Sequence, residues 1–346
     1  MTVDGGLVLP GRTAQTSASG PPLRRYRGGH PALCHAGLTA VPVWGYSEKK
    51  RGLLPWPRGR EGPSMRITVL IENTALSDTL TAEHGLSLYL EYRGTSWLLD
   101  AGTSGAFAAN ADKLGIDLAK VETCLLSHGH YDHAGGLAEF FRRNQTAPVY
   151  AMRGADQPYY SGDGEKRHDI GIPVEVLEAL PRRVHWVDGG TALAPGVWLL
   201  PHSTPGLEQI GAAKKLYRGT EKGVEPDDFA HEMSVVFETA GGLVVFNSCC
   251  HGGLQAVLGE VSRQFPGKPV AAFVGGLHMR GRSHGCEICT FTPQELQAVA
   301  DCAADHGVGA VYTGHCTGGV AYELLRPLMG SRLHPLSTGQ VIELPD

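Results

Sequence analysis

The sequence predicts an α/β fold over residues 65–346, with layers of β-sheet covered by helices. Strand-like and helix-like segments alternate from Met65 onward, and many of the strands are dense in Val, Leu and Ile, as expected when both faces of a sheet are covered. Such alternation is typical of helices packed on sheets. We find no internal repeat along the chain.

Ten segments rich in aliphatic and β-branched residues are expected to be strands: Arg66–Glu72, Ser87–Tyr92, Ser96–Asp100, Thr123–Ser127, Pro148–Ala151, Val197–Leu200, Met233–Thr239, Leu243–Asn247, Val270–Gly275 and Ala310–Tyr312. Five segments are expected to be helices: Gly105–Leu114, Gly135–Arg143, Leu254–Gln264, Pro293–His306 and Gly319–Met329. The fourth has the clearest boundaries, because Thr292 is a typical N-cap, Glu295 completes a capping box and Gly307 follows the end.

Residues 1–64 differ in composition from the rest of the chain. They hold eight of the 22 prolines and eleven of the 47 glycines, and they show no lasting helical or strand period. We therefore predict a disordered extension rich in Pro, Gly and Arg over residues 1–64 and one folded domain over residues 65–346. We also hypothesise that Met65 is the natural first residue, which mass spectrometry of the native N-terminus would test.

Composition narrows the possible partners. No apolar run approaches the roughly 20 residues of a membrane-spanning helix, and no secretory signal is visible, so we expect a cytoplasmic protein without a membrane partner. Residues 1–64 carry nine Lys/Arg against three Asp/Glu, net +6, which leaves −11 for residues 65–346. This acidic body does not indicate a nucleic-acid partner. The oligomeric state is left open.

Four potential metal ligands fall within six residues, directly after an apolar run that predicts a strand. They are His128, His130, Asp132 and His133. A tight turn at a strand end can aim such side chains into one space, and Gly129 permits backbone angles that a side chain would forbid. Neutral imidazoles and a carboxylate suit zinc, iron or manganese. We predict one or two divalent metal ions, with zinc favoured, rather than surface histidines.

The pattern His-x-His-x-Asp-His at residues 128–133 resembles the motif of the metallo-β-lactamase superfamily. The resemblance implies a four-layered αββα sandwich with metals where the strand-end loops meet. It also implies that His128 and His130 hold a first metal and that Asp132 and His133 hold a second. Asp100, in an Asp-x-Gly strand end, is implied to support the motif loop.

Further ligands must come from later in the chain. His251 and His315 each follow a predicted strand and precede glycines and a predicted helix, which repeats the placement of His133, so we predict both as metal ligands. His202, within Pro-His-Ser-Thr-Pro-Gly, is the rival to His251. His278 has the same strand-end placement, and we expect it to contact substrate or transfer a proton.

Three residues are expected to take part in acid–base steps. Asp132 is a candidate base toward water held by the metal, and His278 or His84 is a candidate proton donor to a leaving group. Glycine pairs at the predicted helix starts, such as Gly252-Gly253, either bind anions through exposed backbone amides or only let the ligand loops turn.

The eight cysteines are too sparse for a disulfide scaffold, so reduced thiols are expected. Cys249 stands where many hydrolases of the superfamily have a bridging aspartate. It is either a thiolate ligand or a buried thiol beside the site. Cys286 and Cys289 have Cys-x-x-Cys spacing, which leaves a zinc site, a disulfide switch or plain loop cysteines open.

A narrower resemblance covers nearly all of residues 65–320. Residues 83–87, 126–133, 275–278 and 315–318 resemble a subgroup that contains the archaeal 7,8-dihydropterin-6-methyl-4-(β-D-ribofuranosyl)aminobenzene 5′-phosphate synthases. Those enzymes are implied to join a dihydropterin to a ribosylated aminobenzene phosphate and to displace diphosphate. Ser248 departs from the glycine that the subgroup typically has before its cysteine.

These observations predict a metal-dependent enzyme that acts on an anionic, phosphorylated small molecule. The reaction is either metal-activated hydrolysis or dihydropterin-synthase-like transfer with diphosphate release. The alternative is a non-catalytic metal-binding or thiol redox-sensing module. Hydrolysis of β-lactams has only the shared ligand motif in its favour.

Overall fold

The structure is a computed structural model that describes residues 65–344. The extension predicted over residues 1–64 therefore lies outside the described residues. None of the helices in the described range combines the length and the apolar character needed to cross a membrane.

The first of the two large sheets contains seven strands in the order β20-β1-β2-β3-β4-β5-β8. Their bounds are β1 (Met65–Ile71), β2 (Ser87–Tyr92), β3 (Thr95–Leu99), β4 (Thr123–Leu126), β5 (Val149–Met152), β8 (Val184–Val187) and β20 (Val341–Leu344). Strands β20 to β3 pair antiparallel, whereas β3, β4, β5 and β8 run parallel.

The second large sheet also contains seven strands, in the order β19-β18-β15-β14-β13-β10-β9. Their bounds are β9 (Thr191–Ala194), β10 (Val197–Pro201), β13 (Met233–Thr239), β14 (Gly242–Phe246), β15 (Val270–Val274), β18 (Ala310–Thr313) and β19 (Leu333–Pro335). Here β9 to β14 pair antiparallel, and β14, β15, β18 and β19 run parallel. Each sheet thus contains a set of parallel strands whose carboxyl ends lie at the same edge of the sheet.

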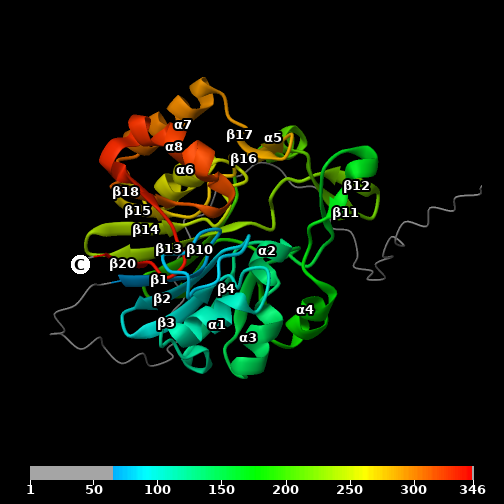
Figure 1. Cartoon of the computed structure of the whole chain (residues 1–346), viewed down its shortest axis with the longest axis vertical. Helices are drawn as coiled ribbons and strands as arrows, with labels where there is room; N and C mark the ends of the chain where they lie inside the picture. Colours follow the sequence, from blue (N-terminus) through cyan, green and yellow to red (C-terminus); the bar gives the residue numbers. More distant parts are fainter. Residues whose placement is uncertain (1–64, 345–346) are drawn as a thin grey trace, which may run out of the picture. The chain divides into compact units, whose positions relative to one another are not determined.

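The two sheets pack face to face, and helices cover their outer faces (Figure 1). Leu88 and Leu90 of the first sheet share a buried core with Val235 and Phe237 of the second. Each such fully buried side chain contributes about 1.5–3 kcal/mol to the stability of the fold.

Separate buried clusters lie between each sheet and its helices. The first sheet is covered by α1 (Ala106–Lys113), α3 (Leu137–Arg143) and α4 (Val174–Ala179), and the second by α6 (Leu254–Gln264), α7 (Pro293–Asp305) and α8 (Gly319–Met329). The predicted four-layered αββα architecture is confirmed.

Smaller elements surround the edge where the parallel strands end. They are α2 (Tyr131–Ala134), α5 (Leu207–Lys214), a small sheet of β6 (Tyr159–Ser161), β7 (His168–Asp169), β11 (Leu216–Thr220) and β12 (Gly223–Pro226), and a hairpin of β16 (Arg280–Ser283) and β17 (Cys286–Cys289). The sequence analysis missed these elements. They are short and rich in glycine and charged residues, so they carry little hydrophobic periodicity.

The ten predicted strands and five predicted helices are all present, with ends within two residues of those expected. The capping box of α7 is confirmed, since the Thr292 side chain accepts from the backbone N–H of Glu295 and the Glu295 side chain accepts from that of Thr292.

Candidate metal centre

The candidate site lies where parallel strands of both sheets end. In the first sheet, β3 leads into Asp100 and β4 into His128. In the second, β14, β15 and β18 lead toward His251, His278 and His315. Because the carboxyl ends of parallel strands lie at the same edge of a sheet, residues far apart in the sequence meet there.

Close backbone packing fixes the turn that carries the motif. A β-carbon on Gly129 would lie 2.1 Å from the carbonyl oxygen of Ala155, and the Gly129 N–H donates to Nδ1 of His231 at 3.0 Å. The φ angle of Gly129 is not positive. The expectation that glycine is needed here for unusual backbone angles is therefore wrong. Glycine is needed because there is no space for a β-carbon. Asp132 and His133 then lie on the short helix α2 rather than on a simple turn.

Three buried imidazoles form the first group of potential ligands. Nitrogen atoms of His128, His130 and His251 lie within 4.8 Å of one another. The three side chains belong to residues that are at most 4% exposed. The Nε2 atoms of His128 and His130 have no hydrogen-bond partner. Buried polar atoms are rarely left unpaired, so a divalent ion fits this position.

A second group lies beside the first and combines a carboxylate with imidazoles. His133 Nε2 lies 3.1 Å from His315 Nε2. Asp132 Oδ2 lies 3.4 Å from His315 Nε2 and 3.8 Å from His133 Nε2. The structure thus brings all six predicted ligands together in two adjoining groups. This donor set of imidazoles and one carboxylate suits zinc, iron or manganese.

Cys249 lies between the two groups. Its Sγ is 3.1 Å from His133 Nε2 and also lies within 4.8 Å of a ring nitrogen of His128. Burial raises the pKa of the thiol well above its usual range. A sulfur in this position can contact ions held by either group.

Carboxylates behind the rings fix their orientation. Asp100 Oδ2 lies 2.8 Å from His133 Nδ1 and accepts from the Ser127 hydroxyl at 2.7 Å, so its expected supporting position is confirmed. Glu232, which is 0% exposed, lies 2.5 Å from His251 Nδ1. Such partners hold each ring with Nε2 directed toward a metal.

The sequence analysis missed Glu232 and a second supporting carboxylate, Glu72. Glu72 accepts from the backbone N–H of His315 at 2.5 Å, and His315 has a positive φ of 50°. Glu72 directly follows β1 and Glu232 directly precedes β13, and both carboxylates are buried. A charged residue at the boundary of an otherwise apolar strand was the available signal.

The structure places His202 behind the site and not in it. Its Nε2 lies 2.9 Å from Glu232 Oε1 and its Nδ1 lies 3.0 Å from Glu260 Oε2. Although burial disfavours the cation, hydrogen bonds to these two carboxylates raise the pKa of His202 to about 10. With both nitrogens engaged, His202 supports His251 through Glu232 and does not compete with it.

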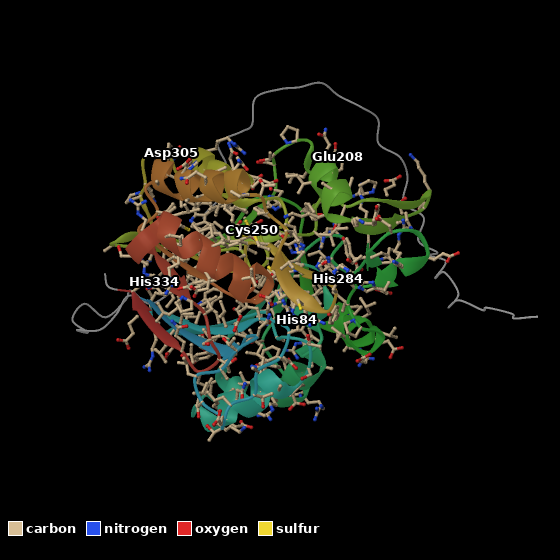
Figure 2. The ribbon with its side chains drawn as sticks, turned by 45° about the horizontal axis from the view of Figure 1, so that its top comes forward. His84, Glu208, Cys250, His284, Asp305 and His334 are labelled. Carbon is tan, nitrogen blue, oxygen red and sulfur yellow. The ribbon has the colours of Figure 1, made fainter. Side chains whose placement is uncertain are left out.

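The predicted acid–base residues border the cluster. His84, whose side chain is 43% exposed, places Nε2 3.3 Å from Asp132 Oδ2, and Arg280 Nη1 lies 3.3 Å from His84 Nδ1. A guanidinium only donates, so Nδ1 accepts, and neutral His84 carries its proton on Nε2, facing Asp132. Figure 2 shows His84 between the cyan and the orange-red parts of the ribbon, with the hairpin beside it.

His278 lies against the first group. Its ring centroid is 4.5 Å from that of His251, and its Nδ1 is buried without a partner. Burial lowers the pKa of His278 to about 4, with a contribution from the nearby His251. Burial likewise lowers the pKa values of His128 and His130 well below normal. These rings are therefore neutral, as metal coordination requires.

Backbone strain is concentrated at the same edge. Asp100, Cys250, His278 and His315 have φ values of 59°, 52°, 49° and 50°. Residues with a side chain rarely adopt this left-handed region, and such strain gathers at functional sites.

The Cys-x-x-Cys pair lies on strand β17 of the hairpin. Successive side chains of a strand point to opposite faces, so Cys286 and Cys289, three residues apart, face opposite ways. Cys286 is cross-strand to Ser283 and Cys289 to Arg280. Both thiols are free. A shared zinc site or a disulfide between them therefore needs the strand to come apart, which favours plain cysteines.

Comparisons with known proteins agree with this geometry. Residues 80–212 match the profile of the metallo-beta-lactamase superfamily. The chain is 24% identical over 299 residues to the 7,8-dihydropterin-6-methyl-4-(β-D-ribofuranosyl)aminobenzene 5′-phosphate synthase of Methanocaldococcus jannaschii, covering 81% of this chain and 97% of that protein.

Two solved structures are also similar. The first is Tm1679, a metal-dependent hydrolase of the beta-lactamase superfamily, with 27% identity and a TM-score of 0.67 over 82% of this chain and all of the other. The second is Zn(2+)-bound PqqB from Methylobacterium extorquens, with 13% identity and a TM-score of 0.50 over 81% of this chain and all of the other. The second likeness concerns the fold alone.

We expect Gly129→Ala to destabilise the motif turn by at least about 1–3 kcal/mol, because the added carbon meets a backbone oxygen that cannot move aside. Thermal unfolding and metal content by mass spectrometry measure the effect. Gly189→Ala is the control, since a β-carbon there meets nothing within 4 Å. Equal stability of the two variants would contradict the packing at Gly129.

The stabilisation that His202 provides should depend on pH. Its folded pKa of about 10 exceeds the usual value of about 6.5, so protonation favours the folded state. The contribution is complete below about pH 6.5 and is lost as the pH rises through about 10. In metal-free protein, His202→Gln should cost about 3 kcal/mol at pH 6 and much less at pH 10 by urea unfolding. His185→Gln, on an exposed residue, is the control, and a cost independent of pH would contradict the buried cation.

Proposed function

Because the chain belongs to the metallo-β-lactamase superfamily, we propose that it is a metal-dependent enzyme acting on an anionic, phosphorylated small molecule. The observation that supports this most is the meeting of six potential ligands from both sheets at one edge. Two of them, His128 and His130, leave buried Nε2 atoms without a partner. A structural role alone does not explain these unpaired atoms.

The two groups of side chains would hold two ions. His128, His130 and His251 would hold the first, and Asp132, His133 and His315 the second, with Cys249 between them. Such ions polarise a substrate oxygen and lower the pKa of bound water toward about 7. Asp100 and Glu232 keep the rings oriented from behind.

Proton transfer is assigned to residues at the border of the cluster. Asp132 and His84 form a contacting pair, and the exposed His84 can exchange its proton with solvent or with a leaving group. His278 presents a buried, unpaired Nδ1 beside His251 and is proposed to contact the substrate or to donate a proton. Asp132 therefore combines the roles of ligand and candidate base.

Hydrolysis of a phosphate ester or diphosphate bond is the reaction that we place first. Water is the nucleophile that such centres commonly activate, and the similar Tm1679 is described as a metal-dependent hydrolase. Transfer with release of diphosphate is the second candidate. It is favoured by the similarity to the Methanocaldococcus jannaschii synthase, which spans 97% of that enzyme.

A non-catalytic metal-binding or thiol-sensing role is the competing proposal. Purified protein distinguishes the two. Bound metal together with phosphatase, phosphodiesterase or lactonase turnover supports the enzyme, whereas bound metal without turnover and a response to thiol oxidation supports the sensor.

We expect His128→Ala to lose most of its bound metal while keeping the fold, because a ligand at a strand end contributes little to the sheet core. Elemental analysis and thermal unfolding of the metal-free protein measure the two effects. His185→Ala, which changes an exposed histidine outside the cluster, should keep its metal. Retention of stoichiometric metal by His128→Ala would count against the proposed centre.

Cobalt substitution tests whether Cys249 is a ligand. A thiolate bound to Co(II) produces a near-ultraviolet charge-transfer band, so we expect this band in the wild-type protein and its loss in Cys249→Ser. Cys302→Ser, which changes a buried thiol on α7, should keep the band. Identical spectra for wild type and Cys249→Ser would make Cys249 a packing residue.

A further inference from the structure

Two cationic side chains border the cluster, and neither is a predicted ligand or acid–base residue. The proposed ligands are buried, whereas His84, Arg280 and Lys214 are partly exposed. His84 and Arg280 lie beside the second group of ligands, and Lys214 lies beside the first.

Arg280 stands next to the second group. Its Nη1 lies 3.3 Å from His84 Nδ1, and His84 in turn contacts Asp132. Its Nε donates to Glu287 at 2.7 Å, and Glu287 also accepts from the backbone N–H of Val320 at 3.2 Å. Glu287 thus fixes one edge of the guanidinium, and the other edge faces the border of the cluster. A planar, oriented guanidinium is well suited to phosphate oxygens.

Lys214 stands next to the first group. Its Nζ donates to the carbonyl oxygen of His251 at 2.9 Å and lies 5.9 Å from the centre of the Phe291 ring. Within residues 65–344, no carboxylate pairs with it. Glu232 is already engaged by His202 and His251.

A partly buried cation without an anionic partner costs free energy. Lys214 is such a cation, and it lies beside His251 of the candidate metal centre. Backbone hydrogen bonds fix the base of the hairpin, which lies between the two cations. The N–H of Met279 donates to the carbonyl oxygen of Cys316, and the N–H of Thr290 donates to the carbonyl oxygen of Met279. The base of the hairpin therefore connects the surroundings of Arg280 with Phe291 and Lys214.

We propose that Lys214 and Arg280 bind the phosphate oxygens of the substrate, Lys214 beside the first group of ligands and Arg280 beside the second. This inference rests on the proposed function and adds the residues that select a phosphorylated ligand over a neutral one. The metals would act on the reacting bond, while the two cations neutralise charge on the phosphate or diphosphate. Glu287 orients Arg280 and is a positioning residue.

The test is calorimetric titration of the metal-loaded full chain with inorganic phosphate. We compare wild type with Lys214→Gln and Arg280→Gln, and we measure metal content in every sample. Lys215→Gln and Arg282→Gln are matched controls, because they remove the same charges from exposed neighbours in the chain. Each of the first two variants should bind phosphate about tenfold more weakly, the loss expected for one charge-assisted hydrogen bond. Arg280→Lys should recover part of the affinity.

The outcomes separate this inference from the proposed function. Full metal content with weakened phosphate binding in Lys214→Gln and Arg280→Gln, and wild-type binding in both controls, supports the anion site. Unchanged phosphate affinity in those two variants, or the same loss in the controls, overturns it. Loss of metal from either variant also overturns it, because the residue then supports the metal centre. If the wild type holds no metal, the proposed function fails, and the same titration of the metal-free protein decides whether the cations bind phosphate.

Discussion

The site depends on one constraint, which is that imidazoles are held in a buried space by acidic partners behind them. Asp100 holds His133, and Glu232 holds His251. Each carboxylate fixes the outer nitrogen of a ring, so the inner nitrogen is aimed into the cluster. Removing such a carboxylate would free the ring to turn and leave buried polar atoms unpaired.

This constraint also ties the site to the fold. Ser127 donates its hydroxyl proton to Asp100. Its carbonyl oxygen accepts from the backbone N–H of Met233, the first residue of β13 in the other sheet. Gly129 donates to His231, which is next to Glu232 in the chain. The motif turn of one sheet and the His251 support of the other are therefore joined by direct hydrogen bonds. Ligands from both sheets keep their spacing because the sheets are connected here, beside the hydrophobic core.

Much of this arrangement could be predicted from the sequence, because the signals lie in short, continuous segments of the chain. The motif at residues 128–133 and the histidines after β14 and β18 follow apolar runs, so strand ends could be recognised and their meeting inferred. Glu72, Glu232 and His231 could not be assigned in this way, because their importance comes from partners distant in the chain. His202 was the rival to His251 because its segment resembles a ligand loop, and the structure excludes it because two glutamates engage both of its nitrogens.

The ligand cluster alone does not choose a reaction, since the same ions can serve hydrolysis or transfer. Selectivity must come from side chains that meet the parts of the substrate away from the reacting bond. In this chain the side chains that we propose for this role lie on α5 and on the hairpin of β16 and β17, which are short elements with weak sequence signals. The strained strand ends carry the proposed ligands, and α5 and the hairpin bring Lys214 and Arg280 beside them. Changes in α5 and the hairpin could thus alter which substrate charge is recognised, while the strand ends and the proposed metal ligands stay in place.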